Sequence, residues 1–133
     1  MKPIANQFTY DKYEFTLIAR QGRLALFAKT KPHHSSWSFE VVLLRIAPAV
    51  TFPDGTSYPE REAMPKSEEW GMYGWTPYDF DSAVAKFRDK VIEHGLDGTR
   101  FWQHERFESF RTKVRSDSVS ENGGSVGGKE VSI

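Results

Sequence analysis

The sequence of 133 residues predicts an α+β fold, in which an antiparallel sheet of about four or five strands packs against one main amphipathic helix. Two observations lead to this prediction. Apolar and polar side chains alternate along the first half of the chain, as in strands with one buried face. Apolar side chains then recur at helical spacing between residues 79 and 94. The length fits a single domain, which we expect to occupy residues 1–115.

The first strands are expected to form a hairpin. Residues 8–20 contain the alternating pattern, Gly22 allows a tight turn, and residues 24–28 form the returning apolar run. Residues 37–46 predict a third strand, whose second face becomes apolar toward its end. Because strands covered on both faces have this composition, the third strand is expected to be central in the sheet.

The chain is expected to turn after a short fourth strand at residues 49–52. The segment Pro53-Asp54-Gly55-Thr56 favours a turn, because proline sets φ, aspartate bonds the local backbone and glycine accepts left-handed geometry. Residues 57–69 lean acidic and contain two prolines, so we expect an irregular segment there.

The strongest helix signal lies between residues 79 and 94. Its apolar stripe consists of Phe80, Ala83, Val84, Phe87 and Val91. Asp79 or Asp81 can cap its first turn, and Gly95 is suited to end it in left-handed geometry. We expect this helix to cover one face of the sheet.

A second, C-terminal helix is predicted from about Thr99 to Val114, because Phe107, Phe110 and Val114 form an apolar stripe. From Ser116 onward Ser and Gly dominate the sequence. Residues 116–133 are therefore predicted to be a flexible tail outside the folded domain.

The most unusual stretch of the sequence places two Trp and two Tyr within nine residues. These candidate binding residues are Trp70, Tyr73, Trp75 and Tyr78. Gly71 and Gly74 between them permit close backbone approach. One interpretation is a patch of exposed rings that binds a partner, since Trp and Tyr often carry interface energy. The alternative is that Trp70 and Trp75 are core residues that fix the segment to the sheet.

A second candidate surface is the basic side of the predicted C-terminal helix. Its basic residues are Arg100, Arg106, Arg111, Lys113 and Arg115, against Glu105 and Glu108. A basic helix with aromatic residues nearby is typical of a surface for nucleic acid or an acidic partner. The alternative is a helix that docks through its Phe side chains and leaves its charges in solvent.

Composition excludes several kinds of site. Without Cys, the chain has no disulfide, thiolate metal site or Cys nucleophile. The pair His33-His34 lacks further ligands at metal-binding spacing, so neither a metal nor a cofactor is expected. No phosphate-binding glycine loop or hydrolase motif is present. No apolar run approaches the roughly 20 residues of a membrane helix, and none resembles a signal peptide, so a cytoplasmic protein is expected.

Two resemblances follow from the stretch around Trp70. The pattern Trp70-Gly71-x-x-Gly74-Trp75-Thr76, followed by Ala83-x-x-x-Phe87, resembles small uncharacterised proteins of bacteriophages and prophages over roughly residues 37–92. That resemblance implies a phage setting and binding to a host or phage protein. Trp70-Gly71 and the helix pattern are also similar to WGR domains, which implies nucleic-acid binding, although Met72 stands where that family has Arg.

The sequence thus leaves three functional hypotheses. The first is a small non-enzymatic protein that binds a protein partner. The second is a nucleic-acid-binding module that uses the basic C-terminal helix and aromatic rings. The third is an enzyme whose active-site residues come together only in the fold. Nothing in the sequence indicates the oligomeric state.

Overall fold

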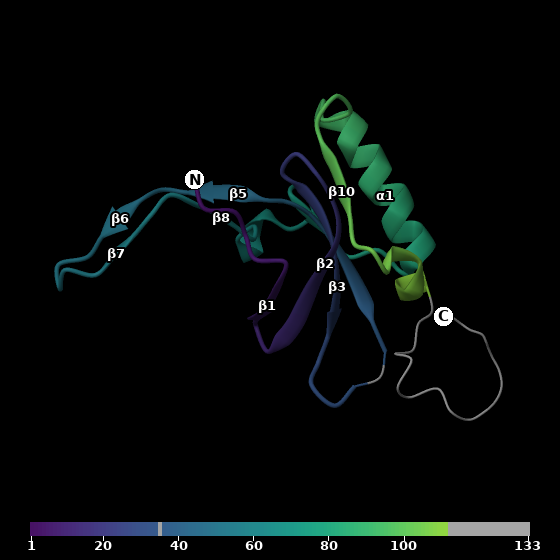
Figure 1. The fold of residues 1–133 in the computed structure, drawn as a ribbon, viewed down its shortest axis with the longest axis horizontal. Coiled ribbons are helices and arrows are strands. Elements are labelled where there is room, and N and C mark those ends of the chain that lie inside the picture. The colour runs from purple at the N-terminus through teal and green to yellow at the C-terminus, as the bar shows by residue number, and fades with distance from the viewer. Residues whose placement is uncertain (35, 112–133) are drawn as a thin grey trace.

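The computed structural model describes residues 1–34 and 36–111, and a single antiparallel sheet lies at its centre (Figure 1). Within these residues the sheet has six strands: β1 (Gln7–Tyr10), β2 (Tyr13–Gln21), β3 (Leu24–Thr30), β4 (Ser38–Leu43), β9 (Gly74–Trp75) and β10 (Phe101–Gln103). Their order is β1-β2-β3-β4-β9, and β10 pairs with the part of β2 that β1 leaves free. An antiparallel sheet with an α-helix is confirmed, but the predicted strand number is too low.

A β-bulge in β2 distributes its side chains between the two faces of the sheet. The register of β2 against β3 shifts between Leu17 and Ala19. As a result the neighbours Ile18 and Ala19 both join the apolar cluster on one face. The alternation then resumes, and Arg20 points to the opposite face, where it bonds Glu62.

Apolar side chains cover both faces of the sheet. On one face α1 (Phe80–Glu93) packs through the predicted stripe, of which Phe80, Ala83, Phe87 and Val91 are buried. The opposite face is covered by Ile4, Phe8, Met64 and Trp70. β4 contributes to both clusters, which confirms that this strand is central. Phe39 and Val41 belong to the helix-side cluster, and Val42 belongs to the opposite one, which Leu44 joins just after the strand.

The helix ends follow the sequence prediction. The side chain of Asp79 accepts a hydrogen bond of 2.8 Å from the backbone N–H of Ser82, which caps the first turn. Gly95 has a φ of +68°, so it ends the helix in the left-handed geometry that glycine tolerates.

The predicted helix from Thr99 to Val114 is wrong over its described residues. Phe101–Gln103 forms β10 instead, and only a short 3₁₀ helix, η2 (Phe107–Arg111), follows. The open edge of β2 supplies backbone partners to this segment, and aromatic side chains suit a strand. Phe107 and Phe110 still share one side, because a 3₁₀ helix repeats every three residues. The predicted tail at 116–133 lies outside the described residues.

Residues 45–63 leave the sheet as a two-stranded arm (Figure 1). Its strands are β5 (Arg45–Ala47), β6 (Val50–Thr51), β7 (Ser57–Tyr58) and β8 (Arg61–Ala63), with β5 paired to β8 and β6 to β7. The predicted turn at 53–56 closes its tip. The prediction of an irregular segment at 57–69 is wrong, since cross-strand pairing orders β7 and β8 and a 3₁₀ helix, η1 (Ser67–Glu69), follows.

Candidate binding surfaces

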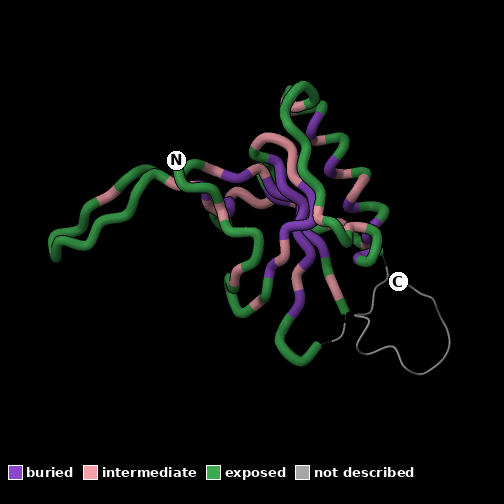
Figure 2. Tube along the Cα trace, viewed as in Figure 1, coloured by how far each residue is buried: buried purple, intermediate pink, exposed green. Residues whose placement is uncertain are grey.

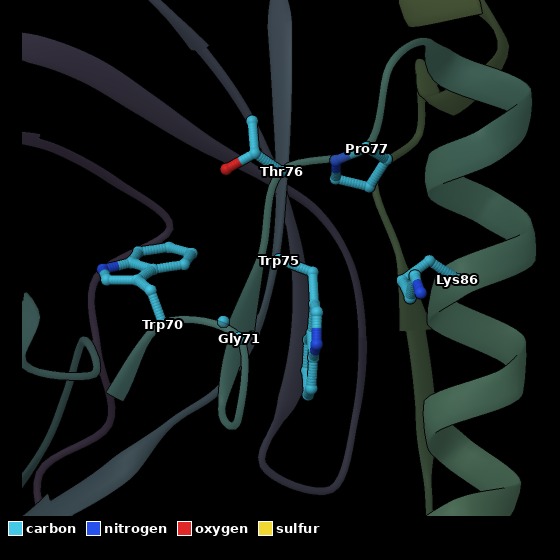
Figure 3. Close-up of a pocket in the computed structure, with 7 residues that line it drawn as sticks. Trp70, Gly71, Trp75, Thr76, Pro77 and Lys86 are labelled. Atoms are coloured by element: carbon cyan, nitrogen blue, oxygen red, sulfur yellow. The ribbon is translucent and has the colours of Figure 1, made fainter. Parts of the chain in front are cut away.

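The structure divides the four aromatic residues of the 70–78 stretch between core and surface. Trp70 packs on the apolar cluster opposite the helix, whereas Trp75 packs on the helix-side cluster. The two indoles lie on opposite sides of β9 (Figure 3). Tyr73 and Tyr78 are 36% and 87% exposed. The four rings therefore do not form one surface, and the two Trp side chains act as packing residues.

A groove of about 520 Å³ follows the segment around β9 (Figure 3). Its lining includes Trp70, Trp75, Thr76, Pro77 and Lys86. Several of its polar groups already have partners inside the domain. The backbone N–H of Gly71 donates to the carbonyl of Gly74 at 2.7 Å, and the Thr76 hydroxyl donates to the buried Glu40 carboxylate at 3.1 Å. We therefore assign this groove to the packing of the sheet edge.

The basic residues expected on one helix face lie in different local structures. Arg100 precedes β10, and Arg106 lies between β10 and η2; both are exposed. Neither guanidinium forms an ion pair with a described residue. Lys113 and Arg115 lie outside the described residues.

Arg111, in η2, is engaged within the domain. Its guanidinium donates to Glu108 at 2.9 Å and to Asp81 of α1, and it lies 4.8 Å from the ring centroid of Phe80. The hydrogen bond to Glu108, with the nearby Asp81 charge, raises the pKa of Arg111. Arg111 thus ties η2 to the start of α1.

The tip of the arm presents two aromatic rings to solvent. Phe52 and Tyr58 are 45% and 47% exposed, and their ring centroids lie 5.9 Å apart in an edge-to-face contact. Figure 2 shows that the outer arm is exposed almost throughout. Between residues 48 and 60 no residue is buried, and only Val50 is intermediate. These rings therefore contribute nothing to a domain core.

Local hydrogen bonds nevertheless order the tip. The N–H of Phe52 donates to the carbonyl of Thr56 at 2.7 Å, and the N–H of Gly55 donates to the carbonyl of Phe52 at 2.9 Å. The Asp54 carboxylate accepts from the N–H of Thr56 at 2.9 Å, and this hydrogen bond lowers the pKa of Asp54. The guanidinium of Arg61 lies 5.6 Å from the Tyr58 ring. The two rings are thus held on a preformed turn.

The base of the arm is anchored to the sheet through Glu62. This carboxylate is buried and accepts from the Arg20 guanidinium, with 2.7 Å between Nη1 and Oε1, and from the N–H of Ile4 at 3.1 Å. Burial opposes ionisation, but the hydrogen bonds from Arg20 and Ile4 outweigh it, so the pKa of Glu62 is lowered. Lys2 adds backbone hydrogen bonds to Glu60 and Glu62. The arm therefore projects from a fixed base.

A second hollow, which we call the β1/β10 notch, lies where β1 and β10 approach each other along β2. It has a volume of about 450 Å³. Its lining residues are Asn6, Gln7, Thr16, Trp102, Gln103, His104 and Glu105. Trp102 is 37% exposed and belongs to neither apolar cluster. The notch thus combines one accessible indole with several planar polar side chains.

The arm and the notch were both missed by reasoning from the sequence. The signal for the arm was available, because the Pro-Asp-Gly turn separates Val50-Thr51-Phe52 from Ser57-Tyr58, and such runs favour a hairpin. The notch had no comparable signal. Its residues come from the first hairpin and from the segment around β10, which is about 85 residues further along the chain, and the sequence predicts a helix at Trp102.

The described residues contain neither a metal-binding cluster nor a helix that could span a membrane. Over residues 1–34 and 36–111, no group of three or more His, Asp or Glu side chains is arranged to hold a metal. In the same ranges, no helix has the length and apolar character needed to cross a membrane. No protein-family model, curated protein or solved structure matches the chain.

Proposed function

We propose that the protein is a small non-enzymatic binding protein that inserts the tip of its β-arm into a protein partner. The observation that carries the proposal is the exposed pair Phe52 and Tyr58, held on an ordered turn away from either apolar cluster. Aromatic side chains are enriched in protein interfaces, where they fill pockets on the partner.

The construction of the arm supports this role. An isolated two-stranded hairpin is at best marginally stable in water, and this one gains its order from its base and its turn. Because the turn is preformed, its backbone would lose little conformational entropy on binding. Pro48, Pro53 and Pro59 interrupt the arm, which hinders pairing of its edges with other strands. Side-chain insertion is therefore favoured over strand addition.

The charge of the arm defines the partner surface. The outer arm, residues 48–60, contains Asp54 and Glu60 and no Lys or Arg, whereas the guanidinium of Arg61 lies beside the Tyr58 ring. A fitting pocket is apolar at its centre, for the two rings, and carries a basic group opposite Asp54 of the turn. The resemblance to phage-encoded proteins supports a host or phage protein in the cytoplasm as the partner that carries this pocket.

Affinity capture with paired variants tests the proposal. The full chain is immobilised either as the wild type or as the double variant Phe52→Ala, Tyr58→Ala. Each form is exposed to a lysate of the cell in which the protein is naturally made, and the bound proteins are quantified by mass spectrometry. Sedimentation equilibrium of each form tests whether a second copy is the partner. The expected result is a protein that is retained by the wild type and lost with the double variant. A dimer formed by the wild type alone would identify a second copy of the chain as the partner of the arm instead. Identical bound proteins and identical monomer masses for the two forms would overturn the proposal.

A further inference from the structure

The β1/β10 notch is an open hollow on the surface with unused polar groups. Its volume is about 450 Å³, and most of its lining residues are exposed. The side-chain amides of Asn6 and Gln103 form no hydrogen bond with any described residue. Gln7 makes one long contact of 3.5 Å to the Thr16 hydroxyl. These amides offer donors and acceptors in the same hollow.

The aromatic part of the notch is accessible and positioned by the fold. Trp102 lies in β10, opposite Arg20 of β2. Its neighbour in the notch, His104, lies 6.3 Å away between ring centroids and is fixed because its Nδ1 accepts from the N–H of Arg106 at 2.9 Å. The Trp102 indole thus provides an exposed aromatic ring beside a set of hydrogen-bonding side chains.

Two cations flank this strand. Arg100 precedes β10, and Arg106 follows Glu105, the last residue that lines the notch. Both are exposed, and among the described residues neither has a carboxylate partner. Arginine without an internal partner is suited to bind phosphate. Along the chain, the two arginines thus bracket the residues around β10 that line the notch, and both are suited to contact a phosphodiester chain.

We propose that the β1/β10 notch binds one unstacked base of single-stranded nucleic acid. Trp102 stacks on the base, the amides of Asn6, Gln7 and Gln103 bond its edge, and Arg100 and Arg106 contact the flanking phosphates. Glu105 accepts a hydrogen bond from an exocyclic amino group, as carboxylates do from cytosine. This site shares no residue with the arm, so it is a second activity rather than part of the proposed protein interface.

The arginines decide between a base and a sugar ring as the occupant. The same indole and amides could contact a neutral oligosaccharide, but a neutral ligand offers no anion to Arg100 and Arg106. A phosphodiester chain offers a phosphate to both arginines. Bases in a duplex are stacked on each other, so their faces are not accessible to Trp102. Single strands are therefore favoured over both alternatives.

The test uses the full chain and fluorescein-labelled mixed-sequence oligonucleotides of about 12 nucleotides, within the span of known single-strand sites. Anisotropy titrations compare single-stranded RNA, single-stranded DNA and a duplex at about 50 and about 200 mM salt. A labelled neutral oligosaccharide is titrated in parallel. The variants are Trp102→Ala, Trp102→Phe, Arg100→Ala and Arg106→Ala. Arg88→Ala, an exposed arginine on α1, is the matched charge control.

Single-stranded oligonucleotides are expected to bind more tightly than the duplex. Trp102→Ala is expected to lower affinity about tenfold or more, while Trp102→Phe, which keeps a ring for stacking, retains most of it. The salt slope is the slope of log binding constant against log salt concentration. Each of Arg100→Ala and Arg106→Ala is expected to reduce its magnitude by about 0.7, whereas Arg88→Ala is expected to leave it unchanged. Circular dichroism confirms that each variant is folded. Absence of binding at low salt, equal duplex binding, insensitivity to Trp102→Ala, or binding of the oligosaccharide alone would overturn the proposal.

Discussion

The six-membered ring of Trp70 lies directly over the α-carbon of Gly74. A Cβ built at Gly74 would overlap Cε3 and Cζ3 of the indole. The sequence predicted close approach at this glycine, and the structure confirms it. The spacing between Trp70 and Gly74 thus closes a turn in which the indole covers backbone and packs on the cluster opposite the helix.

This contact predicts a large effect of one methyl group. Gly74→Ala is expected to lower the free energy of unfolding by about 1–3 kcal/mol, because either the indole or β9 must move to make room. Gly98→Ala is the matched control, since a Cβ there meets nothing within 4 Å. Urea denaturation of both variants measures the difference. Equal stability of Gly74→Ala and Gly98→Ala would contradict the conclusion that the Trp70 ring packs directly on Gly74.

The ion pair between Arg20 and Glu62 predicts acid sensitivity. The pKa of Glu62 is lower in the folded protein than its ordinary value of 4.5. Its stabilisation is therefore complete above about pH 4.5 and is lost as the pH falls through the lowered folded pKa. Urea denaturation between pH 7 and pH 3 should show that the free energy of unfolding of the wild type falls with pH. The fall should be smaller in Glu62→Gln. The exposed Glu14→Gln serves as control and should follow the wild type.

Removal of Arg20 leaves a buried carboxylate without its main partner. Arg20→Ala is expected to lower the free energy of unfolding at pH 7 by about 2 kcal/mol or more. The loss should shrink at pH 3, where Glu62 is closer to neutral. A loss that is constant from pH 7 to pH 3 would show that Arg20 acts through packing alone.

The strand faces and the main helix could be predicted because they depend on local periodicity. In residues 39–44 the side chains alternate between the two clusters with a period of two: Phe39 and Val41 lie in one cluster, and Val42 and Leu44 lie in the other. The apolar stripe of α1 from Phe80 to Val91 follows the helical period. β10 could not be predicted in this way. Phe101–Gln103 is extended because the bulged β2 has an open edge, a tertiary feature that no local pattern records.

The candidate sites were less predictable than the fold. The density of Trp and Tyr makes residues 70–78 a candidate binding patch in the sequence, but the burial of each ring depends on the face of the sheet on which it packs. Trp70 and Trp75 pack on different clusters. Tyr73 and Tyr78 of that stretch stay exposed, and a further pair of exposed rings lies on the arm. Phe52 and Tyr58 looked ordinary in the sequence, since their exposure follows from the projection of the arm away from both clusters.

Arg106 and Arg111 should behave differently, although both belong to the basic set predicted from the sequence. Arg111→Ala is expected to leave oligonucleotide affinity and its salt slope unchanged, because its guanidinium is engaged by Glu108 and Asp81. It should lower the free energy of unfolding by about 0.5–1 kcal/mol, as an exposed ion pair with a cation–π contact does. Anisotropy and urea denaturation of Arg106→Ala and Arg111→Ala give the comparison. An equal loss of salt slope in both would contradict the assignment of Arg111 to structure.

The arm tip should be dispensable for folding. Phe52→Ala combined with Tyr58→Ala is expected to change the free energy of unfolding by no more than about 0.5 kcal/mol per residue, since neither ring contacts a core cluster. Urea denaturation checks this value. A loss of several kcal/mol would mean that the tip stabilises the domain, which would remove the reason to assign it to a partner.

Site-specific photocrosslinking tests the central claim most directly. A benzophenone-bearing amino acid is placed at position 52 of the full chain in one sample and at position 92, an exposed site on α1, in another. Both proteins are irradiated in the producing cell and the crosslinked products are identified by mass spectrometry. The account predicts a discrete protein adduct from position 52 and none from position 92. A discrete adduct from position 92 alone, or the same diffuse products from both positions, would contradict the assignment of the arm as the partner-binding element.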